Sequence, residues 1–373
     1  MSSPLRILMT GVTGYIGGSI LARFLEHPDF ASFKITTLVR SPEKAEKIRA
    51  LGVDAVVGSH NDSELMQSLT ASNDVVFSTT DSDDHEAIIA TLKGMKKRHD
   101  ATGSVPILIH TSGTGFLIDD AKGLYATETI YDDLKSDQIN ALPDTQFHRN
   151  IDLEILRADE AGYIKSYIVL PSTIWGISDG PLVKKGIQNP ISMQVPQLIR
   201  ASLARGRAGM VGEGKNIWPD VNIDEVADLY VVLFNAIRAN HNGVAHGREG
   251  YFFGESGEHT MYEVAKAIGE ALVALGKSDN PEPSTFTKEE VDKYLGVSYF
   301  PTTYSVWKFS WTPNVTASHC HSVHVLQGSD YLGTNSRCSG NRPRALGWKP
   351  VKTKDDFLAS IRAEVEYQIN ISK

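Results

Sequence analysis

Three glycines near the amino end have the spacing of a phosphate-binding turn. They lie in the stretch TGVTGYIGG, residues 10–18, between a short apolar run and a helical pattern. Gly11 permits a tight turn, Gly14 lets backbone N–H groups approach a diphosphate, and Gly17 lets the helix pack closely on the strand. The unpaired N–H groups and the dipole of that helix would then bind the anion. Spacing alone is weak support, but its place between strand and helix favours dinucleotide binding over a purely structural turn.

Neighbouring residues complete the predicted cofactor site. The turn itself contributes Thr13, Tyr15 and Ile16. Thr79 and Thr80 follow the fourth predicted strand, where small hydroxyl side chains suit a groove that holds a dinucleotide. An ordinary strand end would explain these two threonines equally well.

The end of the second predicted strand, LVRSPEK, bears on the type of nucleotide. A carboxylate there would bind the ribose hydroxyls of NAD, whereas a guanidinium suits the 2′-phosphate of NADP. This chain has Arg40 at that point and Lys44 close behind it. A solvated helix start is the alternative interpretation. We predict that NADP(H) is preferred over NAD(H).

These residues depend on a regular alternation of elements over the first 176 residues. Runs of apolar residues without alternation suit parallel strands buried on both faces, and alternating strands and helices predict an α/β Rossmann fold with a doubly wound parallel sheet. The predicted strands are Leu5–Thr10, Lys34–Val39, Val53–Val57, Asp74–Ser78, Val105–Thr111 and Ser166–Leu170. The predicted helices between them are Tyr15–Glu26, Pro42–Ala50, Asp62–Leu69 and His85–Arg98. Residues 113–146 are polar and loop-like, which is unusual unless they cover a site.

The pattern changes after residue 176. We therefore predict a dinucleotide-binding domain over residues 1–176 and a smaller, mostly helical substrate-side region over residues 177–373, interleaved with the main domain. Helices are expected at Met193–Ala204 and Asp224–Arg238, the latter with Asp224 as its amino-terminal cap. Two further helices are expected to open with capping boxes, formed by Thr260 with Glu263 and by Thr287 with Glu290.

Residues 297–327 do not fit this region. They are rich in Ser, Thr and His, have no helical period, and separate two segments that would join naturally. Two interpretations stay open, a genuine insertion and a translated intron. The cluster His319, Cys320, His321 and His324 resembles a set of metal ligands, but in such a segment accidental clustering is the favoured explanation, and we predict no metal site.

Composition excludes several classes of function. The chain has 373 residues, 41% of them hydrophobic and 22% charged, a net charge of −8 and a pI near 5.8. An acidic chain without a basic patch is not expected to bind nucleic acid. No apolar run reaches the roughly 18 residues of a membrane span, and the first residues are too quickly interrupted by glycine for a signal peptide. With two cysteines and no secretion signal, we expect a cytoplasmic protein whose partner is a small-molecule substrate.

Four motifs together resemble the extended and atypical short-chain dehydrogenases/reductases, a superfamily that includes epimerases and dehydratases, dihydroflavonol-reductase-like proteins and NmrA-like proteins. The first motif is the glycine turn, and the others are IHTSGTG (109–115), LPSTIWG (170–176) and VNIDEVADLY (221–230). The resemblance implies that Thr111, Pro171 and Thr173 line the cofactor. It also implies a serine at the end of the fifth strand, matched by Ser112, that orients the substrate carbonyl.

The same resemblance implies a Tyr-x-x-x-Lys pair on the helix before the sixth strand. The tyrosine moves a proton at the substrate oxygen, while the lysine binds the nicotinamide ribose and lowers the pKa of the tyrosine. Tyr131 and Lys135 have this spacing, because residues i and i+4 share a helix face. However, LPDT (142–145) breaks the chain between Tyr131 and the helix that leads into the sixth strand.

On that helix, the family pattern places His148 at the tyrosine position and Asp152 at the lysine position. Imidazole has a suitable pKa for proton transfer, but Asp152 could replace a lysine only through hydrogen bonds and not by charge. Three outcomes stay open: Tyr131 folds back from the loop, His148 is the proton donor, or the site is degenerate.

The leading prediction is an NADP-preferring oxidoreductase that transfers a hydride to or from a small carbonyl or alcohol, or performs an epimerase-like reaction by the same chemistry. The alternative is an NmrA-like NADP-binding sensor without fast catalysis. Relatives often dimerise through helices beside the sheet, so a homodimer is possible by analogy.

Overall fold

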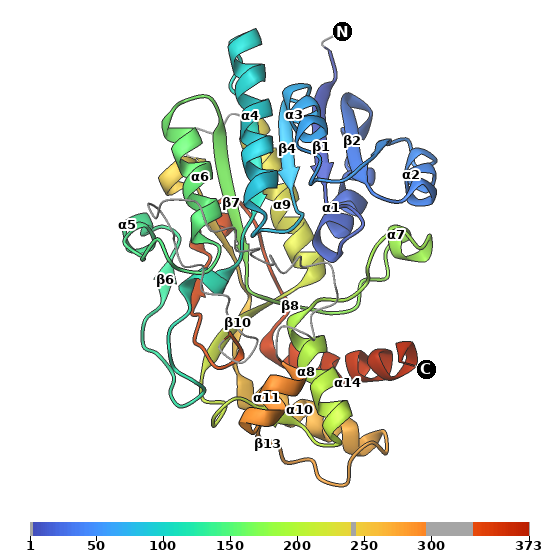
Figure 1. Cartoon of the computed structure of the whole chain (residues 1–373), viewed down its shortest axis with the longest axis vertical. Helices are drawn as coiled ribbons and strands as arrows, with labels where there is room; N and C mark the ends of the chain where they lie inside the picture. Colours follow the sequence, from blue (N-terminus) through green and yellow to red (C-terminus); the bar gives the residue numbers. More distant parts are fainter. Residues whose placement is uncertain (1–2, 240–243, 296–330, 373) are drawn as a thin grey trace, which may run out of the picture.

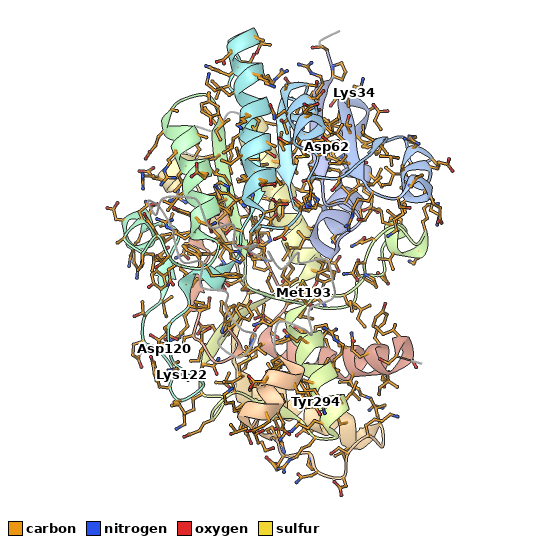
Figure 2. All side chains as sticks on the ribbon, viewed as in Figure 1. Lys34, Asp62, Asp120, Lys122, Met193 and Tyr294 are labelled. Atoms are coloured by element: carbon orange, nitrogen blue, oxygen red, sulfur yellow. The ribbon has the colours of Figure 1, made fainter. Side chains whose placement is uncertain are left out.

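A computed structural model describes residues 3–239, 244–295 and 331–372. The predicted segment 297–327, with its His/Cys cluster, lies outside the described residues. In Figure 1 a sheet flanked by helices forms the upper part of the molecule, and a smaller, largely helical lobe lies below it. Figure 2 places Lys34 near the top of the sheet, Tyr294 in the lower lobe, and Met193 near the level where the two parts meet.

The central sheet has seven parallel strands, as expected for a Rossmann fold. Their order is β11 (Tyr251–Gly254), β7 (Lys165–Pro171), β5 (Ile107–Thr111), β4 (Val75–Ser78), β1 (Leu5–Thr10), β2 (Phe33–Val39) and β3 (Asp54–Val57). The order reverses between β1 and β4, and the carboxyl ends of the strands face the lower lobe (Figure 1). Ligands of open α/β sheets bind outside the carboxyl ends of the strands at such a reversal.

Helices cover both faces of this sheet, which explains the unbroken apolar strands. They are α1 (Tyr15–Leu25), α2 (Pro42–Arg49), α3 (Ser63–Ala71), α4 (His85–Thr102), α6 (Arg149–Glu160) and α9 (Ile223–Arg238). Successive residues of β1 enter different cores: Ile7 and Met9 pack in the cluster that contains α1 and α9, and Leu8 packs in the cluster that contains α4 and α6. The sequence predicted these elements to within a few residues.

The second half of the chain builds both the lower lobe and part of the sheet, since β11 and α9 come from it. Its helices are α7 (Pro181–Lys184), α8 (Gln194–Arg205), α10 (Met261–Ala274), α11 (Lys288–Tyr294), α13 (Asn341–Ala345) and α14 (Lys354–Ile371). Its strands are β8 (Thr173–Trp175), β9 (Gly209–Met210), β10 (Ile217–Asn222), β12 (Gly257–Thr260), β13 (Ser284–Thr285) and β14 (Cys338–Ser339). Both predicted capping boxes are confirmed. The prediction for Asp224 is wrong, because the Asn222 side chain caps α9 by accepting from the Asp224 N–H.

The long polar stretch 113–146 contains short elements that its composition concealed. A 3-10 turn covers Thr114–Leu117, β6 covers Tyr131–Asp132 and α5 covers Ser136–Asn140. β6 pairs with β14, so a segment from the distant carboxyl-terminal part holds this stretch in place.

Candidate active site

The glycine turn packs directly against the end of β4. Gly11 has a φ of +74°, and a Cβ there would lie 2.3 Å from the carbonyl oxygen of Thr79. A Cβ on Gly17 would lie 2.3 Å from Thr79 Oγ1 and 2.5 Å from the Gly11 carbonyl oxygen. Thr79 Oγ1 itself donates to the Thr10 carbonyl at 2.6 Å. Both glycines are therefore required by close backbone approach, and Thr79 forms one wall of the turn.

Gly14 differs from these two glycines because its surroundings are less crowded. It is the N-cap of α1, with no side-chain cap and no acidic residue in the first turn. A Cβ on Gly14 would have one neighbour within 4 Å, the Gly11 carbonyl oxygen at 3.1 Å. Backbone N–H groups at the positive end of a helix dipole, with no side chain in front of them, fit a diphosphate.

Beside the turn, Tyr15 and Lys44 make contacts within the protein. Tyr15 is buried and its hydroxyl donates to the Gly176 carbonyl at 2.5 Å. Lys44 Nζ donates to the Ile187 carbonyl at 2.8 Å. Arg40 is exposed, and no described residue pairs with its guanidinium group. Of the two predicted cations, Arg40 is thus the one whose charge is uncommitted, while Thr13 and Ile16 are partly exposed on the turn.

The other predicted cofactor residues follow the carboxyl ends of neighbouring strands. Thr80 is half-buried after β4. Thr111 ends β5 and its hydroxyl lies 2.5 Å from the Tyr230 hydroxyl on α9. Pro171 ends β7, and Thr173 is buried in β8 with no hydrogen-bond partner for its hydroxyl among the described residues. Thr111 therefore ties β5 to α9.

Ser112 lies directly after β5, and its surroundings differ from those of a serine nucleophile. Its N–H donates to the Val169 carbonyl at 2.9 Å, which fixes the backbone. Its Oγ donates to Asp152 Oδ2 at 3.0 Å, and both side chains are buried. A serine nucleophile needs an adjacent general base, usually histidine. A carboxyl partner without an intervening imidazole instead holds the hydroxyl in one orientation.

His148 lies beside Ser112 as the N-cap of α6. Its φ of +64° is in the left-handed region, which histidine adopts more readily than most residues. Nδ1 lies 2.7 Å from Asp83 Oδ1 and 3.3 Å from Ser82 Oγ. The far edge of the ring faces Gly113 and Gly115: a Cβ on either glycine would lie 3.4–3.5 Å from Nε2. A carboxylate on one nitrogen, and no hydrogen-bond partner among the described residues on the other, are what a general acid–base histidine requires.

The rings of Phe147 and Tyr331 approach Gly115 together with His148. The Phe147 ring centroid lies 3.8 Å from that of His148 and 6.4 Å from that of Tyr331. Trp218 also contacts Tyr331, but it is buried, with Nε1 donating to the Thr334 carbonyl. The ring of His148 is thus bordered by the flat apolar surface of Phe147, which in turn contacts Tyr331.

Burial controls the charge of the polar groups behind Ser112. Desolvation raises the pKa of Asp152 to about 7, although the charge of His148 and the hydrogen bond from Ser112 act to lower it. His110 is buried on β5, and desolvation, together with the charge of His148, lowers its pKa to about 3. Both groups are therefore neutral in mildly acidic solution.

Tyr131 and Lys135 are not on one helix. Tyr131 lies in β6 and Lys135 is the residue before α5, so the i, i+4 argument does not apply to them. Burial and the nearby Asp119 raise the pKa of Tyr131, the opposite of the effect of an adjacent lysine. In Figure 1, β6 lies at the left edge of the molecule, well to the side of α1. Among the described residues, no hydrogen bond joins Tyr131 to Ser112 or His148, whereas His148 Nε2 lies beside Gly113, the residue after Ser112.

Two residues of this constellation were not identified from the sequence. Asp83 lies in the loop after β4, and its signal was a carboxylate three residues beyond Thr80, which was assigned to the cofactor groove. The signal for His110 was a polar residue inside the apolar run ILIHT. Over the described ranges, no three His, Cys, Asp or Glu side chains are placed to hold a metal ion.

The chain is similar to known proteins both in sequence and in fold. The NmrA-like family model matches residues 4–95. The chain is 27% identical over 364 residues to the oxidase ucsJ of an Acremonium species, covering 93% of each chain. The expected resemblance to the extended and atypical short-chain dehydrogenases/reductases is confirmed. The superfamily is of the oxidoreductase type.

Two further proteins are similar to part of the chain or to its fold. A ketoreductase of Stigmatella aurantiaca that acts on a farnesyl dihydroquinoline oxide is 26% identical over 190 residues, covering 47% of this chain and 52% of the relative. The solved dTDP-glucose 4,6-dehydratase of Bacillus anthracis, a complex with NAD, has a TM-score of 0.60 at 14% identity, with 97% of each chain covered. The second likeness shows the fold alone. None of the helices in the described ranges combines the length and apolar composition that crossing a bilayer requires.

Proposed function

We propose that the protein is an NAD(P)-dependent oxidoreductase that transfers a hydride to or from a small carbonyl or alcohol, with His148 as the proton donor and acceptor. The observation that carries the proposal is the Asp83–His148 pair, because its free ring edge faces the loop after β5, next to Ser112. The glycine turn, with Gly14 open before α1, supports a pyridine nucleotide as the cofactor.

The residues would divide the work as follows. A bound nicotinamide supplies or accepts the hydride. Ser112 binds the substrate oxygen, and His148 Nε2 gives a proton to that oxygen during reduction or removes one during oxidation. Asp83 accepts a hydrogen bond from Nδ1, which fixes the tautomer and stabilises the imidazolium form. Phe147 and Tyr331 favour a substrate with a flat apolar portion.

NADP(H) is the preferred nucleotide in this proposal. Arg40 is exposed after β2 and has no partner among the described residues, so its guanidinium group is available to a 2′-phosphate. Asp152 occupies the position at which relatives have a ribose-binding lysine, but it is buried against Ser112. In this protein, residues other than the one at this position must therefore bind the nicotinamide ribose.

The test is NADPH oxidation with a panel of small carbonyl compounds, and NADP⁺ reduction with the corresponding alcohols, by three variants. His148→Asn removes the imidazole while keeping a residue that tolerates the left-handed conformation. It should lower kcat by about 10²–10⁴-fold, the usual contribution of general acid–base catalysis. Asp83→Asn should also lower kcat, but by a smaller factor than His148→Asn. Tyr131→Phe is the control and should leave kcat unchanged.

Two outcomes would contradict the proposal. A loss of turnover in Tyr131→Phe with full activity in His148→Asn would place the proton donor on the loop. Tight NADP(H) binding with no turnover across the panel would favour the NmrA-like sensor.

A further inference from the structure

Asp152 is a buried carboxyl group that the proposed acid–base chemistry does not use. It lies in the first turn of α6 and is completely shielded from solvent. One oxygen, Oδ2, is 3.0 Å from Ser112 Oγ. The other, Oδ1, lies 4.0 Å from His110 Nε2, beyond hydrogen-bond distance. Neither Oδ1 nor either nitrogen of His110 has a hydrogen-bond partner among the described residues.

No cation in the described part of the chain forms an ion pair with this carboxyl group at hydrogen-bond distance. The charged and titratable groups around it are His148 and Arg149 on α6, Asp83 after β4, His110 on β5 and Tyr251 on β11. The guanidinium of Arg149 donates to the Tyr251 hydroxyl and to the Asn140 carbonyl, not to Asp152. His148 directs Nδ1 to Asp83. A buried carboxylate without a paired cation is costly, so the group keeps its proton when it can.

The protonation state of Asp152 determines whether the Ser112 hydroxyl can donate a hydrogen bond to another group. A neutral carboxyl group has one O–H donor, while an ionised one only accepts hydrogen bonds. A serine hydroxyl has one hydrogen and two lone pairs. If Asp152 donates to Ser112 Oγ, the serine hydrogen is left for another acceptor. If ionised Asp152 accepts the serine hydrogen, Ser112 presents only lone pairs to the substrate.

We propose that Asp152 is a positioning residue that sets the direction of the Ser112 hydrogen, so that the protonated site selects a carbonyl oxygen and the ionised site selects an alcohol. The inference rests on the proposed function, in which Ser112 binds the substrate oxygen. Since burial raises the pKa of Asp152 to about 7, the change would fall near neutral pH. Carbonyl binding should then be best in mild acid, and alcohol binding above neutrality.

Infrared difference spectroscopy of the full-length protein tests the proton itself. At about pH 6, one unit below the pKa given above, wild type minus Asp152→Asn should show the carbonyl stretch of a protonated carboxyl group. Ser112→Ala should move that band to higher frequency, because a hydrogen bond is lost, and the band should disappear as the pH rises through neutrality. Absence of the band, or a band that Ser112→Ala leaves in place, would overturn the inference.

Asp133 provides a matched control. Burial also raises its pKa to about 7, but its oxygens accept from the backbone N–H groups of Phe253 and Arg342. The band assigned by Asp133→Asn should therefore not move in Ser112→Ala.

Kinetics test the consequence for the substrate. For the carbonyl compound turned over best and its alcohol, KM of the carbonyl should rise and KM of the alcohol should fall as the pH increases through neutrality. Both trends should be absent in Asp152→Asn and in Ser112→Ala, whereas a merely structural role would lower kcat without removing them. A flat KM in the wild type would overturn the inference. A wild type with the infrared band but no turnover would contradict the proposed function and leave the Asp152 assignment standing.

Discussion

His148 and Arg40 show how much the chemistry of this site depends on single side chains. His148 combines an uncommon backbone conformation with a carboxylate partner, Asp83. Arg40 is a single exposed guanidinium after β2. The first residue is held by contacts within the protein, whereas the second would act through a contact with the cofactor. Substitution of His148 should therefore lower kcat, whereas substitution of Arg40 should weaken the binding of NADP(H).

Arg40→Gln tests the nucleotide preference. Hydrogen bonds to a charged group contribute about 1.5–3 kcal/mol, so the variant should bind NADP(H) roughly 10–100-fold more weakly while NAD(H) affinity stays the same. Lys47→Gln is the control, since Lys47 is on α2 and pairs with Glu43 of the same helix. Fluorescence titration with both reduced nucleotides measures the effect. Equal losses for NADPH and NADH would contradict the assignment of Arg40.

At the scale of elements, the sequence predicted what depends on local pattern and missed what depends on distant pairing. The strands of the sheet were readable because they are unbroken apolar runs, and Gly11 and Gly17 were readable because their spacing matches a turn. The sequence did not predict β6, because its partner β14 lies some 200 residues away and each strand is two residues long. The link from Asp83 to His148 joins the loop after β4 to the residue before α6, and no local periodicity predicts it.

One contact between elements has a consequence for stability. Glu364 on α14 accepts from the N–H of Gly176 after β8, and the Gly176 carbonyl accepts from Tyr15 on α1. Glu364 is 2% exposed, and burial raises its pKa to about 7. The folded state therefore holds this proton more tightly than the unfolded state does. The resulting stabilisation is complete below the unfolded pKa, near 4.5, and is lost as the pH rises to about 7.

Glu364→Gln should remove this pH dependence. Between about pH 4.5 and pH 8, the wild type should lose about 3 kcal/mol more of its free energy of unfolding than the variant does. Urea denaturation at several pH values measures the difference. Glu366→Gln, at an exposed position on the same helix, should follow the wild type. Parallel curves for wild type and Glu364→Gln would show that Glu364 is ionised in the folded protein.

At the scale of the whole molecule, the two halves of the chain meet at the carboxyl ends of the central strands. The first half supplies the glycine turn, Ser112 and His148, and the second half supplies β11, α9 and Tyr331. Because β11 and α9 complete the sheet and cover one face of it, the site is formed only when both halves are folded. The proposed oxidoreductase chemistry therefore requires that the glycine turn bind a pyridine nucleotide.

Calorimetric titration of NADPH into the wild type and into Gly14→Ala tests this most directly. Alanine adopts the φ of −83° that Gly14 has, but its Cβ would lie 3.1 Å from the Gly11 carbonyl oxygen, so the unfolding temperatures of both proteins are measured beside the titration to show that the variant is folded. That Cβ would occupy the space in front of the first turn of α1. The account predicts saturable binding to the wild type and its loss in Gly14→Ala. No binding to the wild type, or equal binding to both proteins, would contradict it.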